Sequence, residues 1–188
     1  MHGGTIPRDH RYALSLEMVR LLPWMAEDEK VGIHQIHGAV TGSDELLLNH
    51  RTKLVLRADK TRVAEIQSLT GRSIKLGNCT LTLGASKLKP ITLHTPLYSH
   101  CVTTGSADEN KFNEDILREL DQMHIETRFI CGKRQRIRVG DTDIYGYSLM
   151  LHGIPIEHAI RVQESGLGMH RRLGCGIFIP HKSIKALE

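Results

Sequence analysis

The chain has 188 residues, with 25 Lys and Arg against 21 Asp and Glu, which gives a formal net charge of +4. The 40% share of hydrophobic residues is enough for a core, whereas only 4% aromatic residues argue against broad base stacking on an aromatic platform. This length allows one large domain or two small ones, and the mild positive charge suits a polyanionic partner.

The cysteines and the hydropathy pattern exclude several protein classes. The four cysteines, at positions 79, 101, 131 and 175, are widely spaced and form no Cys-x-x-Cys pair, so neither a zinc site nor a disulfide framework is expected. No apolar run reaches the roughly 18 residues that a membrane span needs, and no signal peptide is evident. We therefore expect a protein of the reducing cytoplasm, without a membrane, metal or cofactor.

The first half of the chain predicts the order helix, strand, strand, helix, strand. Apolar residues recur at helical spacing over 10–24, with Asp9 as a candidate N-cap and Pro23 near the end. A strand is predicted over 31–40 and strand pieces over 46–48 and 52–56, then a helix over 59–69 and a hairpin over 73–83 that turns at Gly77 and Asn78. Only residues 1–6 stand where an opening strand would lie, so we expect no opening strand in this half.

The second half predicts strand, helix, two strands, helix and strand, the ferredoxin-like order. Its clearest helix covers 108–123, where Phe112, Ile116, Leu120 and Met123 share one face. Strands are predicted over 91–104, over 127–139 in the two pieces 127–130 and 135–139, over 144–151 and over 177–179, and a short helix over 155–164. The fold class is therefore α+β, with two tandem ferredoxin-like units that cover 1–88 and 89–188.

A glycine-rich loop near the C-terminus is the strongest functional signal. Gly166, Gly168, Gly174 and Gly176 bracket the sequence His170-Arg171-Arg172. Glycines let another chain approach the backbone closely, and exposed amides beside arginines form a natural cradle for phosphate. The loop therefore predicts a phosphate-rich partner such as RNA, although a solvated loop tip remains the alternative.

Two further clusters of basic residues point to the same kind of partner. Arg51, Lys53 and Arg57 occur at alternating or nearly alternating strand positions, which predicts one basic face. The second cluster lies on a predicted hairpin, where a basic stripe is able to follow RNA phosphates. It consists of Lys133, Arg134, Arg136 and Arg138. Both clusters are also compatible with faces that serve only solubility.

Four segments together resemble the CRISPR-associated repeat-cleaving endoribonucleases of the RAMP superfamily, and above all the compact MYXAN-type subfamily. These segments are IPRDHRYAL from Ile6, VGIHQIHG from Val31, RTKLVLR from Arg51, and QESGLG from Gln163 continuing through Gly176. The resemblance implies metal-independent cleavage of the repeat RNA in a precursor transcript. In that chemistry a ribose 2′-OH attacks the adjacent phosphate and leaves a 2′,3′-cyclic phosphate and a 5′-OH.

The resemblance also assigns candidate catalytic residues. His34 lies at the position of the family's catalytic histidine, and His10, in the first turn of the first helix, is a candidate second catalytic or RNA-contacting group. Histidine suits proton transfer near neutral pH. In a regular strand, His34 and His37 would face opposite sides and would not form a pair.

Two alternatives remain open at this stage. The chain is either the nuclease, which keeps its guide RNA after cleavage, or a non-catalytic RAMP subunit that holds guide RNA within a larger CRISPR complex. An unrelated RNA-binding protein with two ferredoxin-like units would show no preference for a CRISPR repeat.

Overall fold

The computed structural model describes residues 4–41 and 44–181. These residues form two compact units. Of the described residues, the first unit includes those up to Lys89, Arg138–Asp141 and Arg172–Gly174, whereas the second contains Pro90–Ile137, Thr142–Arg171 and 175–181. Two short segments from the C-terminal half thus belong to the first unit. The predicted division into 1–88 and 89–188 does not include this exchange of segments. None of the helices in the described part of the chain is both long and apolar enough to cross a bilayer.

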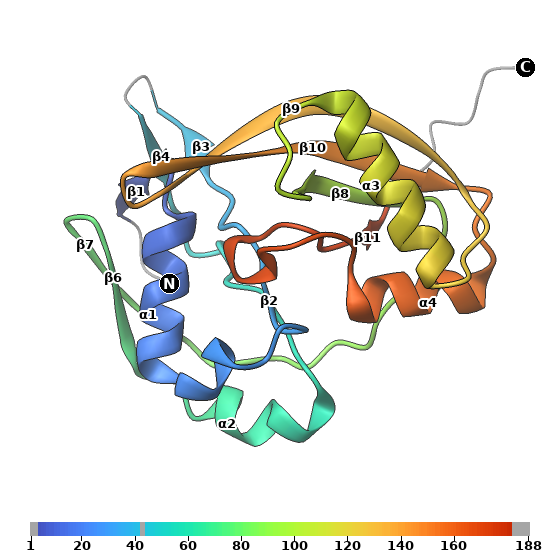
Figure 1. Ribbon diagram of the computed structural model, residues 1–188. Coiled ribbons are helices and arrows are strands. Elements are labelled where there is room, and N and C mark those ends of the chain that lie inside the picture. Colours follow the sequence, from blue (N-terminus) through green and yellow to red (C-terminus); the bar gives the residue numbers. More distant parts are fainter. Residues whose placement is uncertain (1–3, 42–43, 182–188) are drawn as a thin grey trace, which may run out of the picture. The chain divides into compact units, whose positions relative to one another are not determined.

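The second unit has the ferredoxin-like topology that the sequence predicts. Its sheet has the strand order β11-β8-β10-β9, and the helices α3 and α4 follow its first and third strands (Figure 1). The elements are β8 (Leu97–Val102), α3 (Glu109–Gln122), β9 (Arg128–Val139), β10 (Thr142–His152), α4 (Ile156–Ser165) and β11 (Ile179–Pro180).

The core of the second unit explains why α3 forms where it does. Phe112 and Ile116 are fully buried, and Leu120 is 3% exposed, so the predicted apolar stripe faces the sheet. At the start of the helix, Asp108 accepts a hydrogen bond from the backbone N–H of Lys111 at 2.9 Å. The apolar face of α3 and the Asp108 cap together fix the position of the helix on the sheet.

The strand β9 is longer than the sequence pattern predicts. Two strand pieces were expected over 127–130 and 135–139, whereas the structure has one continuous strand of 12 residues. Gly132 lies in the middle, and a Cβ there would come within 2.5 Å of the Ser148 Oγ. The glycine therefore permits close pairing with β10 rather than ending the strand.

The first unit contains three small sheets instead of one. Their strand orders are β1-β4-β3, β2-β5 and β6-β7. The elements are β1 (Thr5–Pro7), α1 (Arg11–Leu21), the 3-10 helix η1 (Pro23–Ala26), β2 (Gly32–Ile33), β3 (Ala39–Val40), β4 (Glu45–Leu47), β5 (Leu56–Arg57), η2 (Lys60–Arg62), α2 (Val63–Gln67), β6 (Ser73–Leu76) and β7 (Cys79–Thr82).

The expectation that this unit lacks an opening strand is wrong. The strand β1 pairs with β4, and Ile6 lies opposite Leu46 and is fully buried. A strand of three residues that ends in proline is too short to show a period-two pattern, and only its partner in the fold identifies it. The unit therefore begins with a strand before α1, as the ferredoxin-like order requires.

The predicted strand over 31–40 is also corrected. Only Gly32–Ile33 and Ala39–Val40 are strands, and the segment between them is irregular. The predicted hairpin over 73–83 is confirmed, since Leu76 pairs with Cys79 across a two-residue turn at Gly77 and Asn78. Gly77 has φ +62, a conformation that suits glycine in such a turn.

Candidate nucleic-acid interface and catalytic histidine

His34 lies directly after β2, where the regular strand has just ended. Its backbone N–H donates to the Val55 carbonyl at 3.0 Å, which extends the β2–β5 pairing by one residue. The side chain is half-buried. The structure therefore places His34 beside the basic segment 51–57, and two stretches that are distant in the sequence become neighbours.

The first turn of α1 holds the two residues that follow His34. The Ile36 backbone N–H donates to His10 Nε2 at 3.0 Å, and Arg11 Nη2 donates to Gln35 Oε1 at 2.7 Å. His10 is 1% exposed and Arg11 is 8% exposed. The neighbouring residues His10 and Arg11 at the start of α1 thus bind the neighbouring residues Ile36 and Gln35 after His34.

His10 uses both ring nitrogens inside the protein. Because Nε2 accepts from Ile36, Nδ1 carries the proton and donates to the Pro7 carbonyl at 3.0 Å. Burial lowers the pKa of His10 below its ordinary value of 6.5, although the hydrogen bond to Pro7 opposes this shift in part. This geometry makes His10 a buried bridge rather than an exposed proton donor. His10, and not Asp9 as the sequence predicts, is the N-cap of α1. The Asp9 Oδ2 instead accepts a hydrogen bond from the Arg138 N–H at 3.3 Å.

The segment Arg172–Gly174 lies against the His34 segment within the first unit. A Cβ at Gly174 would come within 3.2 Å of the Ile33 carbonyl and 3.4 Å of the Gln35 nitrogen, the residues on either side of His34. Arg172 Nη1 donates to the carbonyls of Met25 and Ala26 at the end of η1, at 2.8 and 2.5 Å. The backbone around His34 is therefore supported by α1 and by this segment.

The glycine loop does not expose its amides in the way that the sequence predicts. The N–H groups of three loop glycines donate within the second unit: Gly166 to Val162, Gly168 to the Glu119 carboxylate at 2.8 and 2.9 Å, and Gly176 to Cys101. Cβ atoms at Gly168 and Gly176 would collide with the Thr103 and Leu167 carbonyls. These glycines allow close packing of the protein on itself, and their three amides already have partners, so phosphate binding at these positions stays a prediction.

The guanidinium groups of the two loop arginines donate hydrogen bonds within the protein. Arg171 is 5% exposed, and its guanidinium donates to the carbonyls of Gly176 and Glu164. Arg172, which is half-buried, donates to η1, so both guanidinium groups have partners within the protein, and RNA contact by these two side chains stays a prediction. His170 is exposed with φ +66, and its Nδ1 lies 3.0 Å from Thr103 Oγ1. Within the His-Arg-Arg sequence, the imidazole is thus the side chain that faces solvent.

The basic hairpin residues of β9 are exposed as predicted. We call Lys133, Arg134, Arg136 and Arg138 the basic stripe. The Arg134 guanidinium stacks over the Tyr145 ring at 4.3 Å, and Arg136 Nε lies 3.4 Å from Asp143 Oδ1. Both contacts are at the surface, where ion pairs and ring contacts are weak and easily exchanged for phosphate. The stripe remains a candidate RNA surface.

The basic segment beside His34 is exposed only in part. Arg51 and Lys53 are exposed, whereas Arg57 is half-buried in β5 opposite Gly32. Burial lowers the pKa of the Arg57 guanidinium. Arg51 and Lys53 therefore remain the better candidates for phosphate contacts in this segment.

A family model for Cas6, described as "Cas6 Crispr", matches residues 1–183. The chain is also 33% identical over 181 residues to the CRISPR-associated endonuclease Cas6 of Myxococcus xanthus (strain DK1622), covering 96% of this chain and 78% of that protein. The chain belongs to the Cas6 family. The resemblance inferred from the four sequence segments is therefore confirmed.

Solved structures agree on the fold. A Cas6-related protein from Pyrococcus furiosus superposes with a TM-score of 0.65 at 18% identity, covering 99% of this chain and 95% of that one. A structure titled as a CRISPR-associated Cas6 protein gives 0.69 at 12% identity, with 97% and 95% covered. A RAMP protein that binds different RNA substrates gives 0.64 at 16%, with 94% and 93% covered. Tandem ferredoxin-like units are thus the fold of this Cas6 family member.

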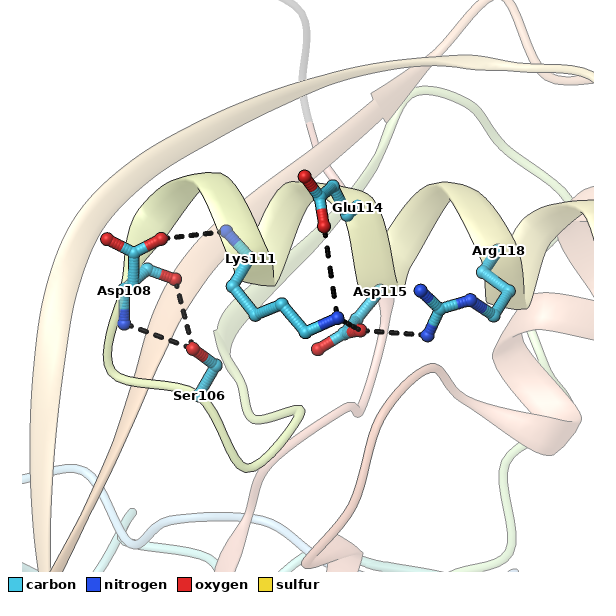
Figure 2. Close-up of polar contacts among 6 residues, drawn as sticks. All are labelled: Ser106, Asp108, Lys111, Glu114, Asp115 and Arg118. Atoms are coloured by element: carbon cyan, nitrogen blue, oxygen red, sulfur yellow. Dashed lines mark hydrogen bonds and ion pairs between the residues drawn. The ribbon is translucent and has the colours of Figure 1, made fainter.

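Figure 2 shows Lys111 and Arg118 of α3, whose cationic groups are both paired with carboxylates of the same helix. On α3, Lys111 Nζ lies 3.2 Å from Asp115 Oδ1 and 3.8 Å from Glu114 Oε2, and Arg118 Nη1 lies 3.0 Å from the same Asp115 oxygen. These carboxylates neutralise both cations. The surface of α3 is therefore a poor match for phosphate, although it carries two cationic side chains, Lys111 and Arg118.

Sequence reasoning missed Arg11 and Gln35 beside His34 in the first unit, and Glu119 as the partner of the Gly168 amide in the second unit. One signal for Arg11 was available, because a cation in the first turn of a helix opposes the helix dipole and calls for an explanation. The Nη1 atom of Arg11 is buried without a hydrogen-bond partner among the described residues. For Gln35 and Glu119 the sequence offers no signal, since only the fold places them beside Arg11 and Gly168.

We expect the stability of the first unit to depend on the neutral state of His10. The pKa of His10 is lower in the folded protein, so the unfolded chain binds the proton first as the pH falls. This contribution to the free energy of unfolding is present above pH 6.5 and is lost as the pH falls below it. The variant His10→Gln should lose this part of the pH dependence.

The measurement is urea unfolding between pH 5 and 8, followed by fluorescence of Trp24, the single tryptophan and a residue of the first unit. His37→Gln, at an exposed histidine, is the matched control and should keep the wild-type dependence of the free energy of unfolding on pH. The same pH dependence in His10→Gln and in the wild type would contradict the interpretation of His10 as a buried bridge.

A pair of glycine variants separates backbone strain from close packing. Gly153 has φ +70 with open space around it, so Gly153→Ala should cost about 1–2 kcal/mol. Gly166 has φ 77 and ψ −172, a region open almost only to glycine, and its Cβ would collide with Arg171. Gly166→Ala should therefore cost roughly twice as much or more in urea unfolding followed by circular dichroism. Equal losses would show that the loop has room to relax.

Proposed function

We propose that this Cas6 family member is a metal-independent endoribonuclease that cleaves the repeat RNA of a precursor CRISPR transcript. A ribose 2′-OH attacks the adjacent phosphate, and the products carry a 2′,3′-cyclic phosphate and a 5′-OH. The Myxococcus xanthus relative bears the name of an endonuclease, and the likeness extends over 96% of this chain. Repeat RNA and the mature guide RNA are then the partners, with other subunits of a CRISPR complex as further candidates.

The observation that carries this proposal is the supported position of His34. Its own N–H is bound to Val55, and the next two residues are bound to Arg11 and His10. Fixed backbone on both sides holds the imidazole in a defined place, which is what proton transfer to a bound substrate requires. The residue as a whole is half-buried, and its ring Nε2 lies below the protein surface.

The reaction needs one base and one acid. The base removes the proton of the 2′-OH, the resulting oxygen forms a bond to phosphorus, and the bond to the 5′-oxygen breaks as the acid supplies a proton. His34 serves as one of these two groups. His10, with both nitrogens bound inside the protein, acts as a positioning residue for His34 rather than as its catalytic partner.

Positive charge near the phosphate lowers the energy of the transition state. Arg11 is buried beside the His34 segment and forms no ion pair with a carboxylate of the described residues. A buried charge acts at longer range than an exposed one because its surroundings screen it less. Arg51 and Lys53 are the exposed cations of the neighbouring segment, and the basic stripe supplies further phosphate contacts that keep the product bound.

A non-catalytic RNA-holding RAMP subunit is the second candidate. The observation in its favour is that His10 is withdrawn from solvent, so the site lacks the second catalytic histidine that the sequence predicts. Such a protein would bind repeat RNA through the same basic residues and would leave it intact.

We expect the wild-type protein to cleave labelled repeat RNA in the presence of EDTA. Replacement of the attacking 2′-OH by 2′-deoxy should abolish cleavage. His34→Ala should lower the cleavage rate by roughly 100- to 10,000-fold, the usual contribution of a general acid or base, with little change in RNA affinity. His37→Ala, at an exposed histidine three residues away, is the control. Tight binding without cleavage by the wild type would instead support the RNA-holding subunit.

The basic stripe should determine part of the salt dependence of RNA binding. Removing one cation that binds a phosphate reduces the slope of log affinity against log salt by about one. Arg134→Gln with Arg138→Gln should therefore reduce the slope by about two. Arg118→Gln is the matched control, because Arg118 is 58% exposed on its side chain but is paired with Asp115. Equal slopes for both variants would exclude the stripe from the RNA interface.

A further inference from the structure

The sheet of the second unit has one face against its helices and one face without them. The residues of the core alternate with a second set along each strand: Leu97 is buried before Tyr98, and Leu149 and Leu151 are buried on either side of Met150. On β9, Phe129 and Cys131 pack against the core. The residues between these positions point to the opposite side of the sheet.

We call this second set the open face. It comprises Tyr98 and His100 of β8, Arg128 and Ile130 of β9, Met150 and His152 of β10, Ile179 of β11, and His181 directly after it. The strand register brings them together, since Tyr98 lies opposite Met150 on one side and opposite Ile179 on the other. Tyr98 therefore occupies the centre of the face on a central strand of the sheet.

Three rings gather at this centre. The Tyr98 ring lies 5.4 Å from that of His181 and 6.1 Å from that of His100, measured between ring centroids. Tyr98 is half-buried and its hydroxyl lies 3.3 Å from His100 Nδ1, so the ring is fixed, while both histidines are exposed. The aliphatic side chains of Ile130 and Ile179 are 57% and 43% exposed beside them.

The strands that carry the open face contain no acidic residue near it. No Asp or Glu occurs in β8, in β11, or in the stretches 128–132 and 148–152 that carry the face. Arg128 and three histidines are the groups of this set that carry or can gain positive charge. A flat surface of rings and aliphatic side chains with cationic neighbours and no carboxylate matches a ligand that has both planar apolar faces and negative charge.

We propose that the open face binds unpaired bases of single-stranded RNA by stacking on Tyr98, His100 and His181. Unpaired bases stack on aromatic and imidazole rings, and phosphates between them meet the adjacent cation. Three rings are enough for one or two bases. The 4% aromatic content that argued against a broad platform is compatible with this small one, because the strand register concentrates the rings at one point. The ligand class rests on the proposed function, in which the substrate is RNA.

The test is fluorescence anisotropy with a 5′-labelled oligouridine of about ten nucleotides, compared with a blunt RNA hairpin whose bases are all paired. Tyr98→Leu with His100→Asn should weaken oligouridine binding by about 10- to 100-fold, the loss expected when a stacked base is released. Binding of the paired hairpin should not change. Tyr98→Phe should keep the affinity of the wild type, because it keeps the ring.

The control is Leu117→Ala with His124→Asn, which makes a similar change at an exposed leucine and an exposed histidine of the helical side. Circular dichroism verifies that each variant folds, and His100→Asn alone, at an exposed site, provides a milder variant. Unchanged oligouridine affinity in a folded Tyr98→Leu/His100→Asn variant overturns the proposal. A change in self-association instead of RNA affinity also overturns it, because the face would then be a contact between copies.

Cleavage of repeat RNA, measured in parallel, separates the two proposals. If Tyr98→Leu/His100→Asn leaves oligouridine binding intact while His34→Ala abolishes cleavage, the open face is excluded and the nuclease stands. If the wild type binds oligouridine through Tyr98 but cleaves no repeat RNA, the nuclease is excluded and the open face stands.

Discussion

The hydrogen bond from the Ile36 N–H to His10 Nε2 is the contact on which the candidate site depends. The segment after His34 is not in a strand, so neighbouring strands do not hold its backbone, and a buried side chain has to supply the partner. A histidine with one donor and one acceptor suits this position, because it also binds the Pro7 carbonyl at the end of β1. Through one ring, the opening strand, the start of α1 and the His34 segment become a single structure.

The glycine loop follows the same principle in the second unit. Its sequence resembles a loop built to receive phosphate, yet Glu119 receives the Gly168 amide and the guanidinium of Arg171 satisfies the carbonyls of Gly176 and Glu164. Burial raises the pKa of the Glu119 carboxyl, and the hydrogen bond from Gly168 partly offsets this shift. The polar groups that make the loop conspicuous in the sequence are thus those that fold it. Exposed cations elsewhere, on β9 and beside His34, are better placed for RNA.

Positive charge alone does not identify an RNA surface in this protein. Lys111 and Arg118 on α3 are neutralised by Asp115 and Glu114, whereas the open face of the second sheet has few cations but no carboxylate at all. The contrast shows that the local balance of charge, together with flat rings such as Tyr98, distinguishes the surfaces. A count of basic residues along the sequence does not separate paired cations from surfaces that lack carboxylates.

The sequence by itself determined the strand and helix order of the second unit, the α3 stripe of Phe112, Ile116 and Leu120, the hairpin at Gly77 and the family. These features depend on local periodicity, turn chemistry or contiguous motifs, which a chain displays before it folds. Only the tertiary structure decided that β1 exists, that His10 is buried, that Arg171 points inward, and that Tyr98, His100 and His181 share a face. Three of these depend on a partner distant in the sequence: Leu46 for Ile6, Ile36 for His10, and the strand register for the three rings. Arg171 binds Gly176 and Glu164, which are near it in the sequence, but only the fold turns its side chain toward them. Burial and pairing are properties of the folded chain, and no local pattern encodes which distant residue will complete them.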